Sequence, residues 1–188
     1  MLARHGSHDE VGLVLSGRSE IPLNQAGRGE AEQLAEKLRQ VPLAAIHSSP
    51  RRRAWETAAI VAARHDLSVT VVDALDEIDF GEWTGSRFDA LAADPRWTLW
   101  NDARASARTP GGEDMAGVVG RAVDHIAGVP DGTLCVSHCD IIRGVVAHYL
   151  GLDLDRLLAF DVDPASLTTL ALHSSSGGRV VALNERAA

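Results

Sequence analysis

Hydrophobic residues along the chain follow two periods, one typical of buried strands and one typical of amphipathic helices. Short apolar runs predict four strands, which are residues 1–3, 44–47, 69–72 and 133–136. Apolar positions that recur every three or four residues predict helices, whose apolar faces are residues 31–38, 54–62, 115–126 and 141–150. Strands that alternate with helices predict βαβ crossovers and a mostly parallel sheet with helices on both faces.

Residues at the ends of these segments predict where each begins and stops. Asn24 is a predicted N-cap of the first helix, and Gly151 is predicted to stop the last one. Residues 167–172 and 179–183 flank the turn 174–178 and predict an antiparallel hairpin. Residues 80–109 hold every tryptophan except Trp55 and predict loops and short helices, the place for a substrate-covering insertion. No repeat or linker divides the sequence, so we expect one domain over residues 1–188.

Composition and charge narrow the function classes. The 188 residues are 45% hydrophobic, and a net charge of −8 argues against a general binder of nucleic acids or anionic membranes. Cys135 and Cys139 are too close in sequence to frame a disulfide fold, and no second cysteine pair completes a zinc site. Neither a signal peptide nor a membrane-spanning stretch is evident, so we expect a soluble, cytoplasmic protein. From the cysteine pattern we expect no metal site.

Polar side chains follow the predicted parallel strands. They are Arg4 and His5, Ser48 and Ser49 with arginines 51–53 behind them, Glu77, and Ser137 with His138. The carboxyl ends of parallel strands meet at one edge of a sheet, so these groups should converge on one pocket. Arginine forks and helix N-termini bind phosphate oxygens, a neutral imidazole can attack phosphorus, and a carboxylic acid can protonate the departing oxygen. The pattern favours a phosphate site built locally in an acidic protein.

Each of these groups also has a purely structural interpretation. Residues 51–53 could be a solvated helix start, although three cations at a helix N-terminus call for a compensating anion. His138 taken alone could equally be a core histidine, and Glu77 lies in an acidic run typical of a solvated face. Asp140 and Arg143 are predicted to form an ion pair. Structural or surface roles are expected for the remaining histidines, which are His8, His47, His65, His125, His148 and His173.

Five short motifs strengthen the functional interpretation. They are RHG at residues 4–6, SPRRRAWETA at 49–58, LDEIDFGEWTG at 75–85, PGGE at 110–113 and VSH at 136–138. In kind and in order they resemble the motifs of the histidine phosphatase superfamily, the phosphoglycerate-mutase-like enzymes. The resemblance spans positions 4 to 143 and so covers most of the chain. It implies a three-layer α/β/α fold with a mostly parallel central sheet and one antiparallel strand.

The resemblance also implies roles for individual residues. His5 would be the nucleophile that becomes phosphohistidine, and Glu77 would be the general acid and later the base that activates water. Arg4, Arg53 and His138 would hold the phosphoryl oxygens, with His138 part of the catalytic set. Such phosphoryl transfer depends mainly on positioning and charge stabilisation, which arginines and imidazoles supply without a metal or another cofactor.

Two departures from the family pattern bear on the substrate contacts. Arg51 stands where the SPLxRA motif has leucine, so either Arg51 or Arg53 could be the second phosphate arginine, and the spacing to Thr57 favours Arg53. The mutases carry an asparagine where this chain has Val11, so contacts from that loop cannot be transferred. Further substrate contacts are expected from Arg18, Arg51 and Trp83.

The activity implied by the resemblance is that of a metal-independent phosphomonoester hydrolase acting on a small phosphorylated metabolite. Homodimers are common in the family, and no nucleic-acid or membrane partner is expected. One alternative is a phosphoglycerate mutase, which transfers the phosphoryl group between substrate hydroxyls; chain length and Val11 argue against it. A second is a non-enzymatic phosphoprotein-binding module of the same fold, against which the presence of both His5 and Glu77 speaks.

Overall fold

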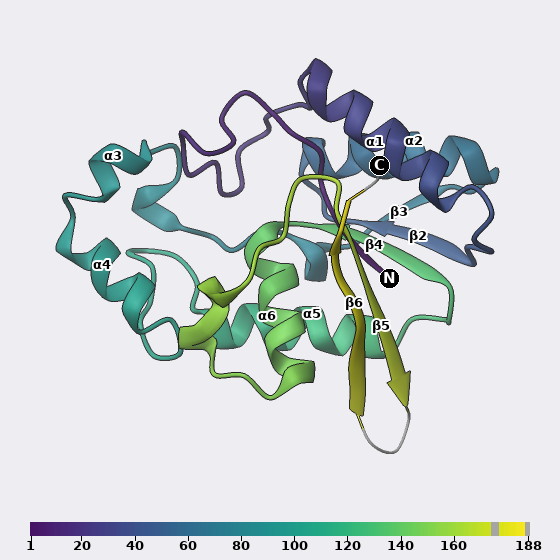
Figure 1. Ribbon diagram of the computed structural model, residues 1–188. Helices are drawn as coiled ribbons and strands as arrows, with labels where there is room; N and C mark the ends of the chain where they lie inside the picture. Colours follow the sequence, from purple (N-terminus) through teal and green to yellow (C-terminus); the bar gives the residue numbers. More distant parts are fainter. Residues whose placement is uncertain (174–176, 187–188) are drawn as a thin grey trace.

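A six-stranded mixed sheet forms the centre of the computed structural model, which describes residues 1–173 and 177–186 (Figure 1). Its strands are β1 (Leu2–Arg4), β2 (Ala45–Ser48), β3 (Val69–Val71), β4 (Thr133–Ser137), β5 (Leu167–His173) and β6 (Gly177–Glu185), in the order β3-β2-β4-β1-β5-β6. Strands β3, β2, β4 and β1 are parallel, and β5 is antiparallel to both β1 and β6. The predicted sheet with one antiparallel strand is confirmed.

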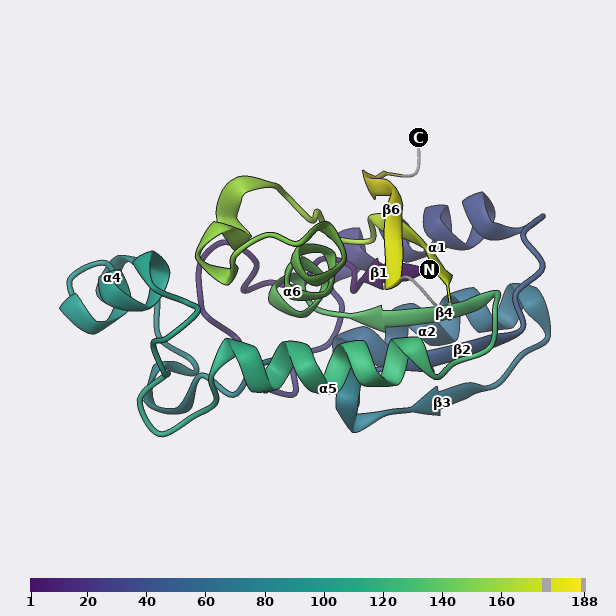
Figure 2. The same cartoon turned by 90° about the horizontal axis from the view of Figure 1, so that it is seen from below.

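Alternate residues of the central strands face opposite layers of helices, as the period of two in a strand requires. Leu2 and Cys135 pack in one core with the helices α5 (Met115–Ala127) and α6 (Cys139–Leu150). Ala3, Leu134 and Val136 point the other way, into a second core with the helices α1 (Gln25–Leu38) and α2 (Arg52–His65). Figure 2 shows α5 and α6 covering their side of the sheet. The three-layer arrangement is therefore confirmed.

The helix and hairpin signals in the sequence are confirmed by local hydrogen bonds and backbone angles. Asn24 caps α1, since its Oδ1 accepts a hydrogen bond of 2.9 Å from the Gly27 N–H. Gly151 ends α6 in the left-handed conformation, with φ of 66°. Strands β5 and β6 pair as the predicted antiparallel hairpin, and the part of the predicted turn at residues 174–176 lies outside the described residues. No helix of the described part of the chain is long and apolar enough to cross a membrane.

Short helices and packed aromatic rings make up the 80–109 segment, which extends to the left in Figure 1. Its elements are the 3-10 helix η2 (Gly81–Trp83) and the helices α3 (Phe88–Leu91) and α4 (Pro95–Asp102). The Trp83 and Trp97 rings meet edge to face with centroids 5.3 Å apart, and the guanidinium of Arg104 lies over the buried Trp100 ring. The tryptophans thus hold the segment together by packing on one another. Two further 3-10 helices are η1 (Asp73–Leu75) and η3 (Leu154–Ala159).

Two glycines let α1 approach the loop that follows β1. A Cβ on Gly6 would lie 2.5 Å from the carbonyl oxygen of Gly27, and a Cβ on Gly27 would collide with the backbone of Ser7. The Gly6 N–H also donates a 3.0 Å hydrogen bond to Oγ1 of Thr57, which lies on α2. Both helices of this layer therefore fix the position of the residues directly after His5.

We predict that Gly27→Ala and Gly29→Ala, two substitutions in the same helix, have opposite effects. The new methyl group at residue 27 must displace the Ser7 backbone, which should lower the free energy of unfolding by about 1–3 kcal/mol. Gly29 faces open space, so its replacement should raise stability by up to about 1 kcal/mol through helix propensity alone. Urea unfolding followed by circular dichroism measures both changes. Equal effects at the two positions would contradict the close contact.

Candidate active site

The ends of β1 and β4 bring two histidines side by side. The two strands are parallel neighbours in which Arg4 pairs with Ser137, so the residues that follow, His5 and His138, emerge together. Their rings are 5.2 Å apart between centroids, and the backbone N–H of His5 donates to the backbone carbonyl of Ser137 at 3.0 Å. The close approach of the two imidazoles, which the parallel sheet predicts, is thus present in the structure.

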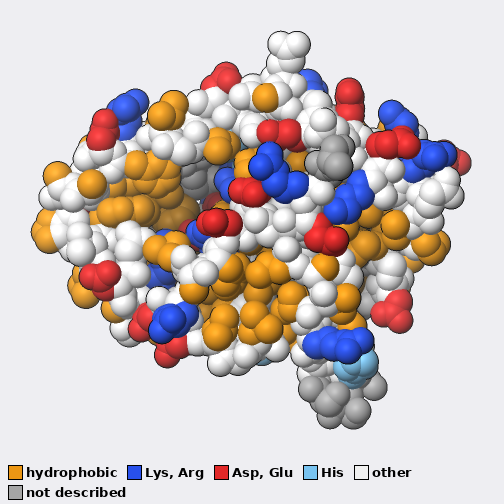
Figure 3. Space-filling model, in the orientation of Figure 1, with side chains coloured by type: hydrophobic (Ala, Val, Ile, Leu, Met, Phe, Trp, Pro, Cys, Tyr) orange, Lys and Arg blue, Asp and Glu red, His pale blue; other side chains and the backbone are white. Residues whose placement is uncertain are grey.

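A small cavity of about 90 Å³ opens in front of His5. Its wall includes Arg4, His5, Arg53 and Glu77, while His138 is fully buried directly behind them. Figure 3 shows a hollow on this face of the molecule, beside the lobe that carries α3 and α4, with hydrophobic side chains over the lobe and Lys or Arg side chains at the inner side. The cavity therefore combines charged groups at its base with an apolar surround.

His5 is held as a neutral imidazole whose Nε2 lone pair faces Arg53. Its Nδ1 lies 2.8 Å from the carbonyl oxygen of Gly6. Because a carbonyl oxygen only accepts hydrogen bonds, Nδ1 carries the proton and Nε2 keeps its lone pair. Burial, followed by the charges of Arg53 and Arg4, holds the pKa of His5 well below its usual range. The residue is therefore a neutral imidazole at neutral pH.

Arg53 is a buried cation whose hydrogen-bond partners are all uncharged. Only 1% of the residue is exposed, and Nε lies 3.3 Å from Nε2 of His5 while Nη2 lies 3.1 Å from Nδ1 of His138. Its other bonds go to the carbonyl oxygens of Gly17 and Ser19. Over residues 1–173 and 177–186, no carboxylate forms an ion pair with it. The free energy of a guanidinium buried in this way falls when an anion enters the cavity and pairs with it.

The neighbouring arginines are neutralised by carboxylates of the chain itself. Arg51 contacts Oδ1 of Asp76 at 2.9 Å and Oε1 of Glu20 at 2.6 Å, and Arg52 contacts Glu56 at 2.9 Å. The compensating anions expected for three cations at the start of α2 are therefore present for two of them. The third, Arg53, is the one that faces the cavity.

Arg4 adds a second positive charge to the cavity wall. Its Nη1 donates to the carbonyl oxygen of Val162 at 2.7 Å, and its buried Nε has no hydrogen-bond partner among the described residues. An unpaired buried donor costs free energy until a partner arrives. An oxyanion in the cavity would supply that partner for Arg4 together with a counter-charge for Arg53.

Glu77 is a buried carboxylic acid. Burial, followed by the nearby charge of Asp140, raises the pKa of Glu77 to about 8, so the group is largely protonated at neutral pH. Oε1 accepts a 3.0 Å hydrogen bond from the Ile78 N–H, and Oε2 lies 3.8 Å from Nδ1 of His138. The acidic run that could have been a solvated face thus places one proton donor inside the site.

His138 is oriented by a chain of hydrogen bonds. Nδ1 accepts from Arg53, so the ring proton sits on Nε2 and points at Oγ of Ser49, 2.7 Å away. The Ser49 hydroxyl in turn lies 3.4 Å from Oδ1 of Asp76. Burial and the charge of Arg53 hold the pKa of His138 well below its usual value. The sequence pattern offered no sign of the links to Ser49 and Asp76.

His8 lies in the cavity wall, so of the structural or surface role expected for it only the surface location is excluded. Only 6% of the residue is exposed, and its ring centroid is 5.3 Å from that of His5. Burial and the charges of Arg53 and Arg4 lower the pKa of His8 to about 4. Its place three residues after His5 was the only available signal, because the loop folds back over the cavity through turns that show no hydrophobic period.

The expected substrate contacts Arg18, Arg51 and Trp83 are absent from the described cavity wall. Arg18 pairs with Glu113 at 2.8 Å, and Arg51 is tied to Asp76. Trp83 is buried, and its indole N–H donates to Asp94. A contact of these three residues with substrate stays a prediction.

Asp140 and Arg143 form the predicted ion pair, but only at 3.8 Å. Asp140 has a closer partner in Arg104, whose Nη1 is 3.1 Å from Oδ1. Arg104 lies almost fully buried in the 80–109 segment. A charged group of that segment thus reaches the surroundings of the site.

The family profile of the histidine phosphatase superfamily (branch 1) matches residues 1–186. The chain belongs to this superfamily. The phosphoserine phosphatase 1 of Hydrogenobacter thermophilus is 28% identical over 179 residues, which cover 90% of this chain and 84% of that protein. The glucosyl-3-phosphoglycerate phosphatase of Mycolicibacterium vanbaalenii is 28% identical over 195 residues, covering 95% and 86% of the two chains.

Solved structures show the same likeness. A native mycobacterial glucosyl-3-phosphoglycerate phosphatase superposes with a TM-score of 0.86 at 28% identity, covering 98% of this chain and 97% of that one. YhfR of Bacillus stearothermophilus superposes with a TM-score of 0.89 at 28% identity, covering 98% and 95%. Relatives named as phosphatases within the superfamily support a phosphoric monoester hydrolase.

The raised pKa of Glu77 predicts that Glu77→Gln stabilises the protein in alkaline solution. An unfolded chain releases this proton near the ordinary pKa of 4.5, whereas the folded protein keeps it up to about 8. Folding therefore loses stability as the pH rises through this window, by at most about 1.4 kcal/mol per pH unit. Glutamine carries no proton to lose, so the melting temperature of the variant relative to wild type should rise steadily from about pH 5 to about pH 9. A difference that stays constant with pH would contradict the buried neutral acid.

Proposed function

We propose that the protein is a phosphomonoester hydrolase that transfers the phosphoryl group of a small phosphorylated metabolite first to His5 and then to water. The observation that carries the proposal is the buried Arg53 guanidinium, placed between Nε2 of His5 and Nδ1 of His138 without a carboxylate partner in the described chain. A phosphate dianion would neutralise Arg53 and Arg4 together. The positive charge that phosphoryl transfer requires is then supplied by guanidinium groups, so we expect no divalent cation to be needed.

In the first step Nε2 of His5 attacks phosphorus from the side opposite the leaving oxygen. An N–P bond forms as the P–O bond breaks. The departing oxygen takes the proton of Glu77, so the organic part of the substrate leaves as an alcohol. The neutral state of His5 and the protonated state of Glu77 match these two roles. Arg4 and Arg53 would hold the phosphoryl oxygens during the transfer, and His138 would join them through Nδ1 when a dianion in the cavity favours protonation of that nitrogen.

In the second step the ionised Glu77 takes a proton from a water molecule. The water oxygen attacks phosphorus, the N–P bond breaks, and its electron pair returns to Nε2 of His5. Inorganic phosphate leaves, and Glu77 is protonated again for the next turnover. One carboxyl group serves as acid and then as base because its pKa of about 8 lies near the working pH.

The lining of the cavity favours a small substrate whose organic part extends past an apolar rim. Val11, Val14 and Phe88 line the wall next to the charged groups. Val11 and Val14 come from the loop after Gly6, and Phe88 begins α3. We therefore assign the choice of substrate to the loop after Gly6 and to the 80–109 segment, with a sugar, amino-acid or nucleoside monophosphate as the class to survey first.

Replacing each arginine by lysine should show whether Arg53 or Arg51 binds the phosphate group. Lysine cannot reproduce the guanidinium fork, so Arg53→Lys should lower kcat/KM for an aryl phosphate by about 10²-fold or more. Arg51→Lys, a matched substitution at the start of the same helix, keeps a cation near Asp76 and should change kcat/KM by less than about tenfold. Steady-state kinetics on variants of verified fold decide the assignment. A larger loss for Arg51→Lys would transfer the phosphate role to Arg51.

The phosphohistidine step can be tested by trapping the intermediate. Wild-type enzyme mixed with a ³²P-labelled phosphomonoester and quenched in alkali should carry a protein-bound label that acid releases. His5→Ala should show no label and should lose hydrolysis in the presence of EDTA. His173→Ala, a matched change of an exposed histidine on β5, should behave like wild type. Hydrolysis by His5→Ala at a rate near that of wild type would exclude the proposed mechanism.

A further inference from the structure

Two histidines and a cysteine meet on the face of the sheet that α5 covers, with His47 two residues before Ser49 and Cys135 three residues before His138. His47 on β2 and Cys135 on β4 are register partners, so their side chains leave the same face of the sheet. His125 lies in the last turn of α5, the helix that covers this face. The proposed catalytic chemistry uses none of these three residues.

The three potential ligand atoms are close enough to share one ion. His47 Nδ1 and His125 Nε2 are 3.1 Å apart, and all three ligand atoms lie within 4.8 Å of one another. A tetrahedral zinc ion with bonds of about 2.0–2.3 Å places its ligand atoms about 3.3–3.7 Å apart. The present spacing therefore approaches that of a metal site, and small side-chain rotations would complete it.

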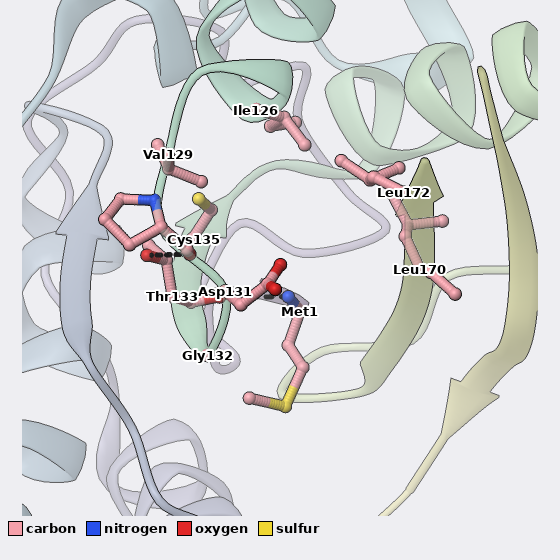
Figure 4. A pocket seen from close by; sticks show the side chains of 11 residues that line it. Met1, Ile126, Val129, Asp131, Gly132, Thr133, Cys135, Leu170 and Leu172 are labelled. Carbon is pink, nitrogen blue, oxygen red and sulfur yellow. Dashed lines mark hydrogen bonds between the residues drawn. The ribbon is translucent and has the colours of Figure 1, made fainter. Parts of the chain in front are cut away.

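The imidazoles and the thiol stand in different environments, and burial raises the pKa of the Cys135 thiol to about 11, so a bound metal must displace its proton. The two imidazoles are half-buried, so an ion can reach them from solvent, whereas Cys135 is only 1% exposed. Figure 4 shows Cys135 close to Val129 and Ile126, at the end of α5 and just beyond it. Among the described residues the Cys135 thiol has no hydrogen bond, and it stands in an apolar core. Two imidazoles and one thiolate are a donor set that suits zinc and related borderline metals.

We propose that His47, His125 and Cys135 form a binding site for a divalent transition metal of the zinc type, with the fourth position left to solvent. On binding, the Cys135 thiol releases its proton to solvent and the His47–His125 hydrogen bond is exchanged for two metal–nitrogen bonds. The ion joins β2, β4 and α5. Because β2 leads to Ser49 and β4 leads to His138, it would also stiffen the two strands that present the Ser49–His138 pair.

Cobalt substitution tests the site directly, since a thiolate bound to Co²⁺ gives a charge-transfer band in the near ultraviolet. Protein freed of metal by chelation should develop this band with one Co²⁺ per chain, and Zn²⁺ should remove it. His125→Asn should weaken Co²⁺ binding at least tenfold, and Cys135→Ser should lose the band. Cys139→Ser, a matched change of the other cysteine, should keep both the band and the stoichiometry.

Thermal unfolding provides a second readout that does not depend on catalysis. Zn²⁺ should raise the melting temperature of wild type and Cys139→Ser by several degrees and leave that of His125→Asn unchanged. His125 is half-buried, so this variant decides the question should Cys135→Ser fail to fold. Absence of the band in wild type, its persistence in Cys135→Ser, or its loss in Cys139→Ser would overturn the proposal. None of these outcomes bears on the phosphohistidine mechanism.

Discussion

The buried charge of Arg53 is the constraint on which the site depends. Removing a guanidinium from water costs several kcal/mol unless other groups compensate. Here its hydrogen-bond partners within the described chain are two carbonyl oxygens and two imidazole nitrogens, all of them uncharged, and the nearby carboxyl groups of Glu77 and Asp76 form no ion pair with it. Burial, followed by this same charge, lowers the pKa values of His5, His8 and His138, which keeps the three imidazoles neutral. The buried cation therefore leaves the site without a counter-charge and, together with burial, favours a neutral His5.

The sheet and its helices place the groups around that charge with little freedom. Parallel pairing of β1 with β4 sets His5 beside His138, and the glycine contact between the first loop and α1 holds the backbone after His5. Arg53 comes from the first turn of α2, where Arg51 and Arg52 are already paired with carboxylates. The local neutralisation of two arginines explains why only the third is left to act on the cavity.

Periodicity and short motifs predicted most of the fold, because strand and helix faces follow from the spacing of apolar residues. The meeting of Arg4, His5, Arg53, Glu77 and His138 followed from a general rule, namely that the carboxyl ends of parallel strands share one edge. His8 escaped prediction because its position depends on an irregular loop rather than on a repeating pattern.

The cluster of His47, His125 and Cys135 escaped prediction for a different reason. A search for cysteine pairs along the sequence cannot find candidate ligands contributed by register partners on two strands and by a helix that covers them. Tertiary packing alone creates such groupings. Spacing rules for metal sites therefore find those that lie within one short segment and miss those assembled across a sheet.

Glu77 shows how the outer part of the structure can influence the chemistry. A carboxyl group near two arginines would ordinarily be ionised, since Arg53 and Arg4 both lower its pKa, yet burial and the charge of Asp140 outweigh them. Asp140 is itself paired at 3.1 Å with Arg104, which rests on the Trp100 ring in the 80–109 segment. Asp140 therefore lies between Arg104 of this segment and the buried carboxyl group whose pKa it raises. The segment that rims the cavity is in this way also connected to the proton donor at its base.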